Sequence, residues 1–341
     1  MIVRVATIYQ VAKRAGVSAA TVSRVLARPA MVTASTRATV LTAVKALGFI
    51  PNAAAKSLRS LRTRKLLVTV PDISNPFFSE ILRGIEETAQ RAGYSVLLGD
   101  TQHDRAREDR YAAMLRQKEA DGLIFLGHRL PKEVASLVRA SSPICAPVVN
   151  GCEFSPGLGV PSVHIDNAKA AADAVAHLCR LGHRRIGIIT GPLESPLSRD
   201  RLAGAMAFAR KRRIASACRV VHGDFSIESG AVAGERLLAK PNRPTAIFCF
   251  NDEMAMGLLL TARQRGLNVP RDLSIVGFDD IRFARCVDPP LTTIAQPAWA
   301  IGEGTVRLLL EILDGQGARP ASITLPHTLN IRASTAPPFG G

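Results

Sequence analysis

The chain has 341 residues, and its 44 Lys and Arg residues outnumber its 28 Asp and Glu residues, which gives a formal net charge of +16. This length exceeds one ordinary core and suits two or three domains. The sequence has no run of about 18 apolar residues and no apolar signal segment at its start, so we expect a cytoplasmic protein without a membrane span. The six cysteines are scattered without the close pairs of metal or redox motifs, which predicts reduced packing residues and no metal site.

The positive charge is concentrated at the start of the chain. Residues 1–71 contain twelve Lys and Arg residues and no Asp or Glu, because the first acidic residue is Asp72. This segment therefore carries +12 of the total, and the remaining 270 residues carry only +4. A solvated surface normally mixes both signs, whereas an acid-free basic segment is typical of proteins that bind a phosphate backbone. We therefore expect nucleic acid as a partner.

Within this segment the spacing predicts a helix-turn-helix. Thr7 and Gln10 form the capping box of a first helix, Gly16 supplies a tight turn, and Ser18 caps a second helix that extends to Leu26. One face of the second helix is apolar, with Val22, Val25 and Leu26, and the other carries Ala20, Ser23, Arg24 and Ala27. The alternative is a surface helix pair in an ordinary globular domain, and the acid-free charge disfavours it.

A third helix and a linker follow. Thr33 or Ser35 caps a helix whose apolar stripe ends before Gly48. Residues 52–64 are rich in small and basic types and have too few apolar groups for a core, which predicts a linker. Two interpretations of this linker remain open, a transient helix and a helix that forms on DNA.

From Lys65 onward, short β-rich runs alternate with longer amphipathic segments. The predicted strands are 66–70, 95–98, 122–126, 147–149, 162–165, 185–190, 246–250 and 273–277. The predicted helices are 77–91, 105–118, 167–181, 199–212, 228–238, 252–265 and 299–313. This alternation predicts an α/β fold with parallel sheets covered on both faces, and the number of strands favours two Rossmann-like lobes.

Sequence motifs of catalysis are absent. The chain has no Gly-x-Gly-x-x-Gly after a strand, no P-loop, no His-Glu-x-x-His and no Gly-x-Ser-x-Gly, and its seven histidines are dispersed. The sequence therefore predicts neither an enzyme nor a cofactor.

Ligands of open α/β sheets lie beyond the carboxyl ends of the strands, so the residues after each predicted strand are candidates for binding. Aromatic, amide, carboxylate and guanidinium side chains gather at these positions, namely Phe77, Phe78, Asn150, Asp166, Arg201, Phe225, Asn251 and Asp279. Such a set suits a polar ring with hydroxyls, because aromatics stack on the ring while carboxylates and guanidinium bind its polar groups. The alternative for each residue is an ordinary helix N-cap or a core phenylalanine.

Taken together, these residues resemble the LacI/GalR family of transcriptional regulators over essentially the whole chain. The resemblance rests on 11–12, 16–18, 21–24, 50–52, 191–192, 251–252, 277–280 and 290–294. Within the family, the chain most resembles the cytidine-type repressors, through 70–73, 75–81, 98–100, 126–127, 163–167 and 286–290. The resemblance implies a homodimer that binds a double-stranded DNA operator, hinge helices in the minor groove, and a periplasmic-binding-protein-like core that closes on a small effector.

The resemblance also implies roles for individual residues. Ala19, Ala20 and Arg24 would face base edges, Thr21 and Ser23 would meet phosphate, and Leu58 would insert into the central minor-groove step. The full implied DNA-binding set is Thr7, Ser18, Ala19, Ala20, Thr21, Ser23, Arg24, Thr33, Asn52, Ala55 and Leu58. The effector set is the strand-end group given above.

The chain departs from the family pattern in two places. Ala27 stands where the family usually has Asn after the recognition helix, which puts one backbone contact in doubt. Ser195 and Leu197 replace residues that purine-responsive members use, which disfavours that mode of purine recognition. In contrast, Asn52, Ala55 and Leu58 keep the hinge pattern of the general family.

We predict a head at 1–51, a hinge at 52–64 and a core at 65–341. The first lobe of the core would comprise 65–164 and 292–322, and the second lobe 165–291 and 323–341. The predicted function is a sequence-specific DNA-binding repressor controlled by a nucleoside or sugar. The alternatives are a solute-binding protein, disfavoured by the acid-free head, and a two-lobed α/β enzyme, disfavoured by the missing catalytic motif.

Overall fold

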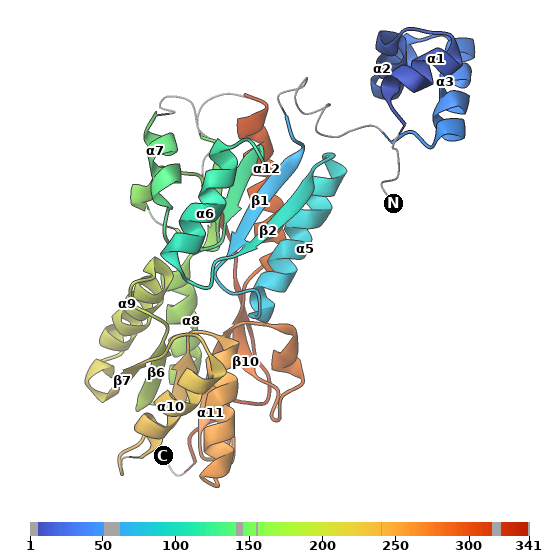
Figure 1. Cartoon of the computed structure of the whole chain (residues 1–341). Coiled ribbons are helices and arrows are strands. Elements are labelled where there is room, and N and C mark those ends of the chain that lie inside the picture. The colour runs from blue at the N-terminus through green and yellow to red at the C-terminus, as the bar shows by residue number, and fades with distance from the viewer. Residues whose placement is uncertain are drawn as a thin grey trace. The chain divides into compact units, whose positions relative to one another are not determined.

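The computed structural model describes residues 6–50, 62–140, 146–154, 156–239, 241–315 and 322–339 (Figure 1). The chain divides into two compact units, Met1–Thr63 and Arg64–Gly341, called here the head and the core. Within the described residues, no helix is long and apolar enough to cross a membrane.

The head consists of three helices, α1 (Ile8–Ala15), α2 (Ala19–Ala27) and α3 (Ala34–Leu47), with a 3-10 turn, η1, at Pro29–Met31. Their apolar faces meet in one small core that includes Val11, Val22, Val25 and Val40. The predicted capping box at Thr7 is confirmed, since both of its reciprocal hydrogen bonds with Gln10 are present. The predicted cap at Ser18 is confirmed as well, because its hydroxyl accepts a hydrogen bond from the Thr21 N–H.

The core contains two six-stranded sheets. The first has the order β11-β5-β4-β3-β1-β2, and its paired strands are parallel. Its strands are β1 (Lys65–Val70), β2 (Ser95–Asp100), β3 (Gly122–Phe125), β4 (Val148–Gly151), β5 (Ser162–Ile165) and β11 (Ile323–Leu325). Helices α5 (Pro76–Arg91) and α12 (Ala298–Leu313) pack on one face, and α6 (Arg105–Arg116) and α7 (Lys132–Ala140) pack on the other.

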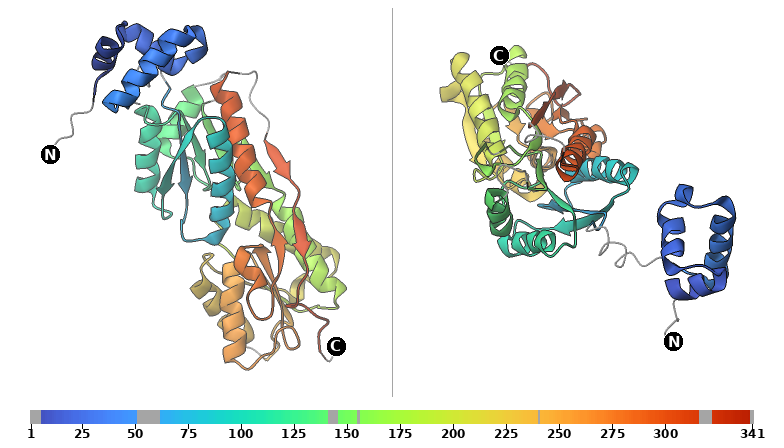
Figure 2. Two further views of the ribbon diagram at one scale, coloured as in Figure 1. Left: turned by 90° about the vertical axis from the view of Figure 1, so that its right-hand side faces the viewer. Right: turned by 90° about the horizontal axis from the view of Figure 1, so that it is seen from above.

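Helices α5 and α12 lie side by side on the first sheet (Figure 2). Gly84 of α5 allows their close approach, because a Cβ at this position would lie 2.2 Å from the Trp299 carbonyl oxygen. The crossing therefore depends on a residue without a side chain.

The second sheet has the order β12-β10-β9-β8-β6-β7, and only β12 is antiparallel to its neighbour. Its strands are β6 (Ile186–Thr190), β7 (Arg219–His222), β8 (Ala246–Cys249), β9 (Ser274–Asp279), β10 (Thr292–Ala295) and β12 (Thr328–Asn330). The helices of this lobe are α8 (Asn167–Arg180), α9 (Pro196–Lys211), α10 (Ile227–Leu238) and α11 (Asp252–Gln264). Short 3-10 turns lie at η2 (Pro156–Leu158), η3 (Ala215–Ala217) and η4 (Arg282–Arg285).

The predicted fold class is confirmed, with a helix-turn-helix head and a two-lobed α/β core built on parallel sheets. All eight predicted strands and seven predicted core helices are present, with ends that shift by up to three residues. The α-helices and strands that the sequence did not predict are α7, β7, β10, β11 and β12, and it predicted none of the 3-10 turns.

The predicted lobe boundaries are wrong at two strands. They placed 292–295 in the first lobe and 323–325 in the second, whereas β10 pairs with β9 of the second sheet and β11 pairs with β5 of the first. The physical reason is that strand pairing, which no local pattern encodes, decides to which sheet a short strand belongs. The chain consequently passes between the lobes three times, after β5, after β10 and after β11.

Candidate functional site

The head presents one exposed stripe on α2. Val22 and Val25 are buried in the head core, while Ala20, Arg24 and Ala27 are exposed. These three positions are spaced four and three residues apart, so they lie on one face of the helix. Ala19, Thr21 and Ser23 are half-buried beside this stripe. The exposed face therefore offers methyl groups and one guanidinium.

The remaining predicted DNA contacts of the head lie at helix N-termini. Thr7, Ser18 and Thr33 are all exposed and stand directly before α1, α2 and α3. Helix N-termini attract phosphate, because their first N–H groups have no partner within the helix. Thr33 differs from the other two, since its hydroxyl bonds to the Thr36 hydroxyl at 3.0 Å and accepts no helix N–H. The predicted hinge contacts Asn52, Ala55 and Leu58 lie outside the described residues.

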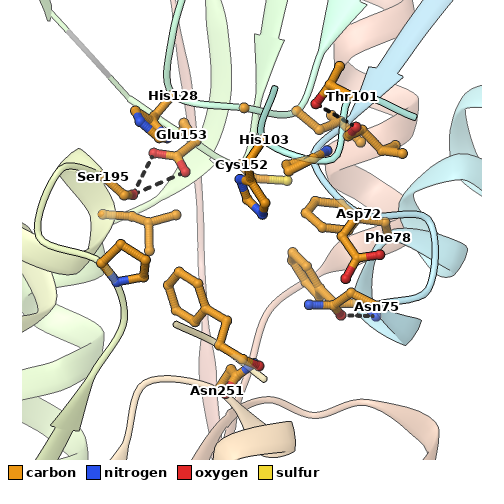
Figure 3. A pocket seen from close by; sticks show the side chains of 18 of the residues that line it. Asp72, Asn75, Phe78, Thr101, His103, His128, Cys152, Glu153, Ser195 and Asn251 are labelled. Atoms are coloured by element: carbon orange, nitrogen blue, oxygen red, sulfur yellow. Dashed lines mark hydrogen bonds between the residues drawn. The ribbon is translucent and has the colours of Figure 1, made fainter. Parts of the chain in front are cut away.

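The core contains a cavity of about 830 Å³. Its walls are formed by segments that follow the carboxyl ends of strands in both sheets (Figure 3). Six of the eight predicted effector residues line it, namely Phe77, Phe78, Arg201, Phe225, Asn251 and Asp279. The structure thus brings together residues that are up to 202 positions apart in the chain.

Aromatic rings lie on walls contributed by both lobes. Phe77 and Phe78 lie in the first turn of α5, and their ring centroids lie 5.6 Å apart. Asn75 caps this helix by accepting a hydrogen bond from the Phe77 N–H at 2.9 Å. On the second lobe, Phe225 has a left-handed φ of 75°, and its carbonyl accepts a 2.7 Å hydrogen bond from the Asn251 amide.

The ring of Phe225 also depends on a glycine. A Cβ at Gly191 would lie 2.1 Å from this ring, so only glycine leaves room for the observed position. Two features therefore fix the position of the Phe225 ring, namely the hydrogen bond from the Asn251 amide and the absence of a side chain at Gly191.

Arg201 is the buried cation of the cavity, with 3% of its surface exposed. Its Nε donates to the Asn167 side-chain oxygen at 2.8 Å, its Nη1 donates to the Phe250 carbonyl, and its guanidinium stacks over the Phe278 ring at 3.5 Å. Burial lowers its pKa to about 10, against the effect of nearby carboxylates. The side chain is therefore charged at neutral pH and fixed in orientation.

Asp279 is the buried carboxylate opposite this cation. It is 8% exposed, and it accepts a 2.7 Å hydrogen bond from the Gln296 amide. Burial raises its pKa to about 6, and Arg201 acts in the opposite direction. No ion pair joins Asp279 to Arg201 among the described contacts, so each retains hydrogen-bonding capacity toward the cavity.

The sequence prediction missed a second buried carboxylate, Glu153, which is 6% exposed. It follows β4 of the first lobe and accepts hydrogen bonds from the hydroxyl of Ser195, at the start of α9 in the second lobe (Figure 3). Burial raises its pKa to about 7, with Arg201 and the Ser195 hydrogen bond opposing the rise. Glu153 therefore links the two lobes directly at the cavity wall.

The prediction for Asn150 is corrected by the observed strand. The sequence ended this strand at 149, whereas β4 continues to Gly151, so Asn150 is a buried strand residue that does not line the cavity. Its amide donates to the carbonyls of Phe125 and Gly127 at 2.9 and 3.0 Å. Cys152 and Glu153 take the position at the strand end, and both line the cavity.

Asp166 is likewise not a cavity residue. It is exposed and caps α8 by accepting a hydrogen bond from the Lys169 N–H at 2.9 Å. This is the N-cap role that the sequence left open as the alternative. Its neighbour Asn167 acts at the site instead, because it holds Arg201.

Further polar groups of the first lobe line the cavity without having been predicted. Asp72 follows β1, Thr101 and His103 follow β2, and His128 follows β3 (Figure 3). The same strand-end rule that identified Phe77 would have found each of them. Burial, followed by the charge of Arg129, lowers the pKa of His128. On the second lobe, burial and then Asp72 raise the pKa of Glu253 to about 7.

The described residues hold no group of three or more His, Cys, Asp or Glu side chains that could bind a metal ion. The cysteines among them are free thiols, and Cys152 lines the cavity.

A helix-turn-helix head joined to a two-lobed core with a ligand-sized cavity defines a class of proteins, the regulators that bind DNA and a small molecule. Comparisons agree with this class. Residues 7–52 match the model of bacterial regulatory proteins of the lacI family, and residues 175–335 match a periplasmic binding protein-like domain.

Similar proteins cover between 80% and 98% of the chain. The HTH-type transcriptional repressor CytR of Escherichia coli is 44% identical over 331 residues, which are 97% of this chain and 96% of the relative. The lac repressor dimer bound to operator and the anti-inducer ONPF has a TM-score of 0.88 and 30% identity, over 98% of this chain and 100% of that chain. A regulator of Enterococcus faecium with bound ribose has a TM-score of 0.70 and 28% identity, over 80% of this chain and 99% of that chain. The chain belongs to the LacI family of bacterial transcriptional regulators.

Proposed function

We propose that the chain is a cytoplasmic homodimeric repressor whose affinity for an operator is changed by a nucleoside or sugar bound in the core cavity. The observation that carries this proposal is the pairing of an acid-free helix-turn-helix head with a cavity that combines aromatic walls and a buried cation and carboxylate. The CytR relative is a repressor by name, and the lac repressor relative is a dimer on operator DNA.

In this proposal the exposed stripe of α2 reads the major groove. The methyl groups of Ala19 and Ala20 suit contact with thymine, and Arg24 is the strongest donor for a base edge. Thr7, Ser18, Thr21, Ser23 and Thr33 position the head on phosphates. Asn52, Ala55 and Leu58 complete the minor-groove contact.

The cavity binds the effector through charge-assisted hydrogen bonds. The Asp279 carboxylate accepts from hydroxyl groups, and the Arg201 guanidinium donates to ring or hydroxyl oxygens. Phe77, Phe78 and Phe225 provide faces on which a base or sugar ring packs. The ribose held by the Enterococcus faecium relative has this chemistry.

Effector class is tested by thermal-shift measurements against nucleosides, nucleobases and pentoses. A ligand at about 100 times its Kd adds about 2.7 kcal/mol to stability, so a specific effector raises Tm measurably. We expect cytidine, adenosine or a pentose to raise Tm, and Asp279→Ala to remove the rise. A rise with organic acids or amino acids alone would contradict the effector class.

Operator binding is tested by selecting genomic fragments on the full-length protein and titrating the best fragment at several salt concentrations. The acid-free head predicts that log affinity falls against log salt with a slope of about −0.9 per phosphate, over about six or more phosphates. A nearly flat salt dependence would contradict phosphate-driven binding by the head.

A further inference from the structure

The edge of the second sheet opposite the cavity carries a concentration of arginines. Strands β6, β7, β8 and β9 are parallel, so their first residues lie along one edge. Arg184 and Arg185 directly precede β6, Arg219 begins β7, and Arg243 lies three residues before β8. These arginines come from three separate chain segments, and the topology places them together.

Two helix ends add to this edge. Arg180 is the last residue of α8, and α9 ends in the basic run 210–213. Arg180, Arg184 and Arg212 all lie within electrostatic range of the Cys179 thiol, whose pKa each of them lowers against the effect of burial. We call the set Arg180, Arg184, Arg185, Arg212, Arg219 and Arg243 the arginine face.

Like the head, two chain segments that carry members of the arginine face contain no acidic residue. Residues 174–193 and 201–223 contain nine Lys and Arg residues and no Asp or Glu. Most of the basic side chains in these stretches are exposed, including Arg180, Arg184, Arg185 and Arg212. Surface charges that serve only solubility normally alternate in sign, as they do along α6, where Glu108 and Asp109 lie among arginines.

A hollow of about 340 Å³ lies at this edge, lined by Arg185, Arg243 and Arg271 together with Pro338 and Phe339. The one acid in its lining, Asp272, accepts hydrogen bonds from Asn268 and forms an ion pair with Arg271 at 3.3 Å, so the charges of Asp272 and Arg271 offset each other. In the part of the chain that the structure describes, Arg185 donates only through Nε, to the Arg243 carbonyl, so its Nη groups point to no protein acceptor. The Nη groups of Arg185 are therefore donors that the hollow offers to an external anion.

Stabilisation of helix ends explains only some of the arginines of the arginine face. Basic residues in the last turn of a helix favour the helix dipole, which accounts for Arg180 and for the run that ends α9. Arg184, Arg185, Arg219 and Arg243 lie before or at the start of strands, outside the last turn of any helix. In addition, Arg219 Nη1 is buried with no hydrogen-bond partner among the described residues. Within the fold, Arg185 Nε donates to the Arg243 carbonyl and Arg243 Nη1 donates to the Asp272 carbonyl, so only part of the donor capacity of these two arginines is used.

We propose that the arginine face is a second nucleic-acid contact, which binds the phosphate backbone of a DNA duplex without reading its sequence. Guanidinium groups match phosphate oxygens with paired N–H donors. Such a contact is electrostatic and independent of sequence, so its affinity falls as the salt concentration rises. This contact goes beyond operator binding by the head, because it lies on the core.

The test uses the full-length protein saturated with its selected, unlabelled operator fragment. A fluorescently labelled random duplex of about 30 base pairs is then titrated, and its anisotropy is measured at several salt concentrations. The face variant is Arg184→Glu/Arg185→Glu/Arg212→Glu. The matched control, Arg105→Glu/Arg110→Glu/Lys118→Glu, makes the same charge change at exposed positions on and directly after α6. Melting temperatures verify that both variants fold.

We expect the wild-type complex and the control to capture the second duplex, and the face variant to bind it at least about tenfold more weakly, with a salt slope smaller by about 2 to 3. Equal binding by the face variant and the control would overturn the proposal. If the wild-type complex binds polyglutamate and not the random duplex, and the face variant loses this binding, the face contacts an acidic protein and the proposal is overturned. Failure to form the operator complex would count against the proposed function alone, because the random duplex can then be titrated directly onto both variants.

Discussion

The head and the cavity of the core use polar side chains in opposite ways. On the head, the candidate contacts are short or exposed side chains within a few helical turns, and their removal leaves no buried group unpaired. In the cavity, Arg201, Asp279 and Glu153 are buried, come from both lobes and hold protein partners. The comparison teaches that binding and folding are separable on the exposed stripe of α2 and coupled in the cavity.

The largest effect that tests this comparison is expected for Arg201→Ala. The substitution removes a buried cation from among carboxylates and leaves Asn167 and the Phe250 carbonyl without their donor. We expect a loss of about 3 to 5 kcal/mol in unfolding free energy together with loss of the effector-induced rise in Tm. Denaturant unfolding measures the first quantity, and Arg210→Ala, at an exposed position of the same helix, is the control. Unchanged ligand shifts would separate Arg201 from the effector.

The next effect concerns pH and Glu153. Because its pKa is raised from 4.5 to about 7, the folded state binds this proton more tightly than the unfolded state. The associated stability is complete below about pH 4.5 and is lost as the pH rises through 7, which amounts to up to about 3 kcal/mol. Glu153→Gln removes this dependence, so the variant gains stability relative to wild type between pH 5 and pH 8. Parallel pH curves for wild type and Glu153→Gln would contradict the assignment, and the exposed Glu194→Gln is the matched control.

On the head, Arg24→Ala is expected to act on binding alone. If Arg24 reads a guanine, operator affinity falls by about 1 to 3 kcal/mol and preference relaxes at one base pair of each half-site. The Tm of the protein stays near wild type because the side chain is exposed. Competition titrations with substituted operators measure this preference. Equal losses on operator and random DNA would reassign Arg24 to phosphate.

The smallest expected effects are those of substitutions at two helix caps of the head, Thr7 and Thr33. Thr7→Ala removes a reciprocal capping box and is expected to cost the head about 1 kcal/mol of stability. Thr33→Ala is expected to cost less, because the Thr33 hydroxyl accepts no helix N–H. Thermal unfolding of the two variants, compared by a probe local to the head, measures the difference, and an equal cost would contradict it.

Local patterns in the sequence were sufficient to predict the helices of the head. Capping residues, turn glycines and apolar spacing all act within about four residues, and the observed α1 and α2 begin where Thr7 and Ser18 predict. The same is true of the buried central strands of the core, whose continuous apolar runs leave little choice. In contrast, β7 is half-exposed, and β11 and β12 have three residues each, so their sequences carry little pattern.

The sequence predicted that the cavity lies at the carboxyl ends of the strands, but it did not predict every residue that lines the cavity. The strand-end rule found Arg201 and Asp279, but a strand end placed two residues early selected Asn150 in place of Glu153. A shift of this size changes which side chain leaves the sheet and enters the cavity. The link from Glu153 to Ser195 joins two lobes through residues 42 positions apart, and pairing at this distance has no local signal.

The threefold passage of the chain between the lobes has a consequence for synthesis of the protein. Strands β1 to β5 leave the ribosome first, yet the sheet that they form is completed only by β11, which follows every second-lobe strand except β12. Bonds from Ser162 to Ser322 close this gap of 160 residues.

Helix α12 also arrives late, and until it does, α5 lacks the neighbour whose Gly302 lies against the backbone of Ile81 and Ile85, and the core of the first lobe lacks the apolar side chains of α12. The emerging first lobe therefore exposes apolar surface during translation of more than a hundred residues, a situation that favours chaperone binding. A nascent chain stopped at Ile165 lacks both late elements of its own lobe, so we expect the two lobes to finish folding together, after release of the C-terminal segment from the ribosome.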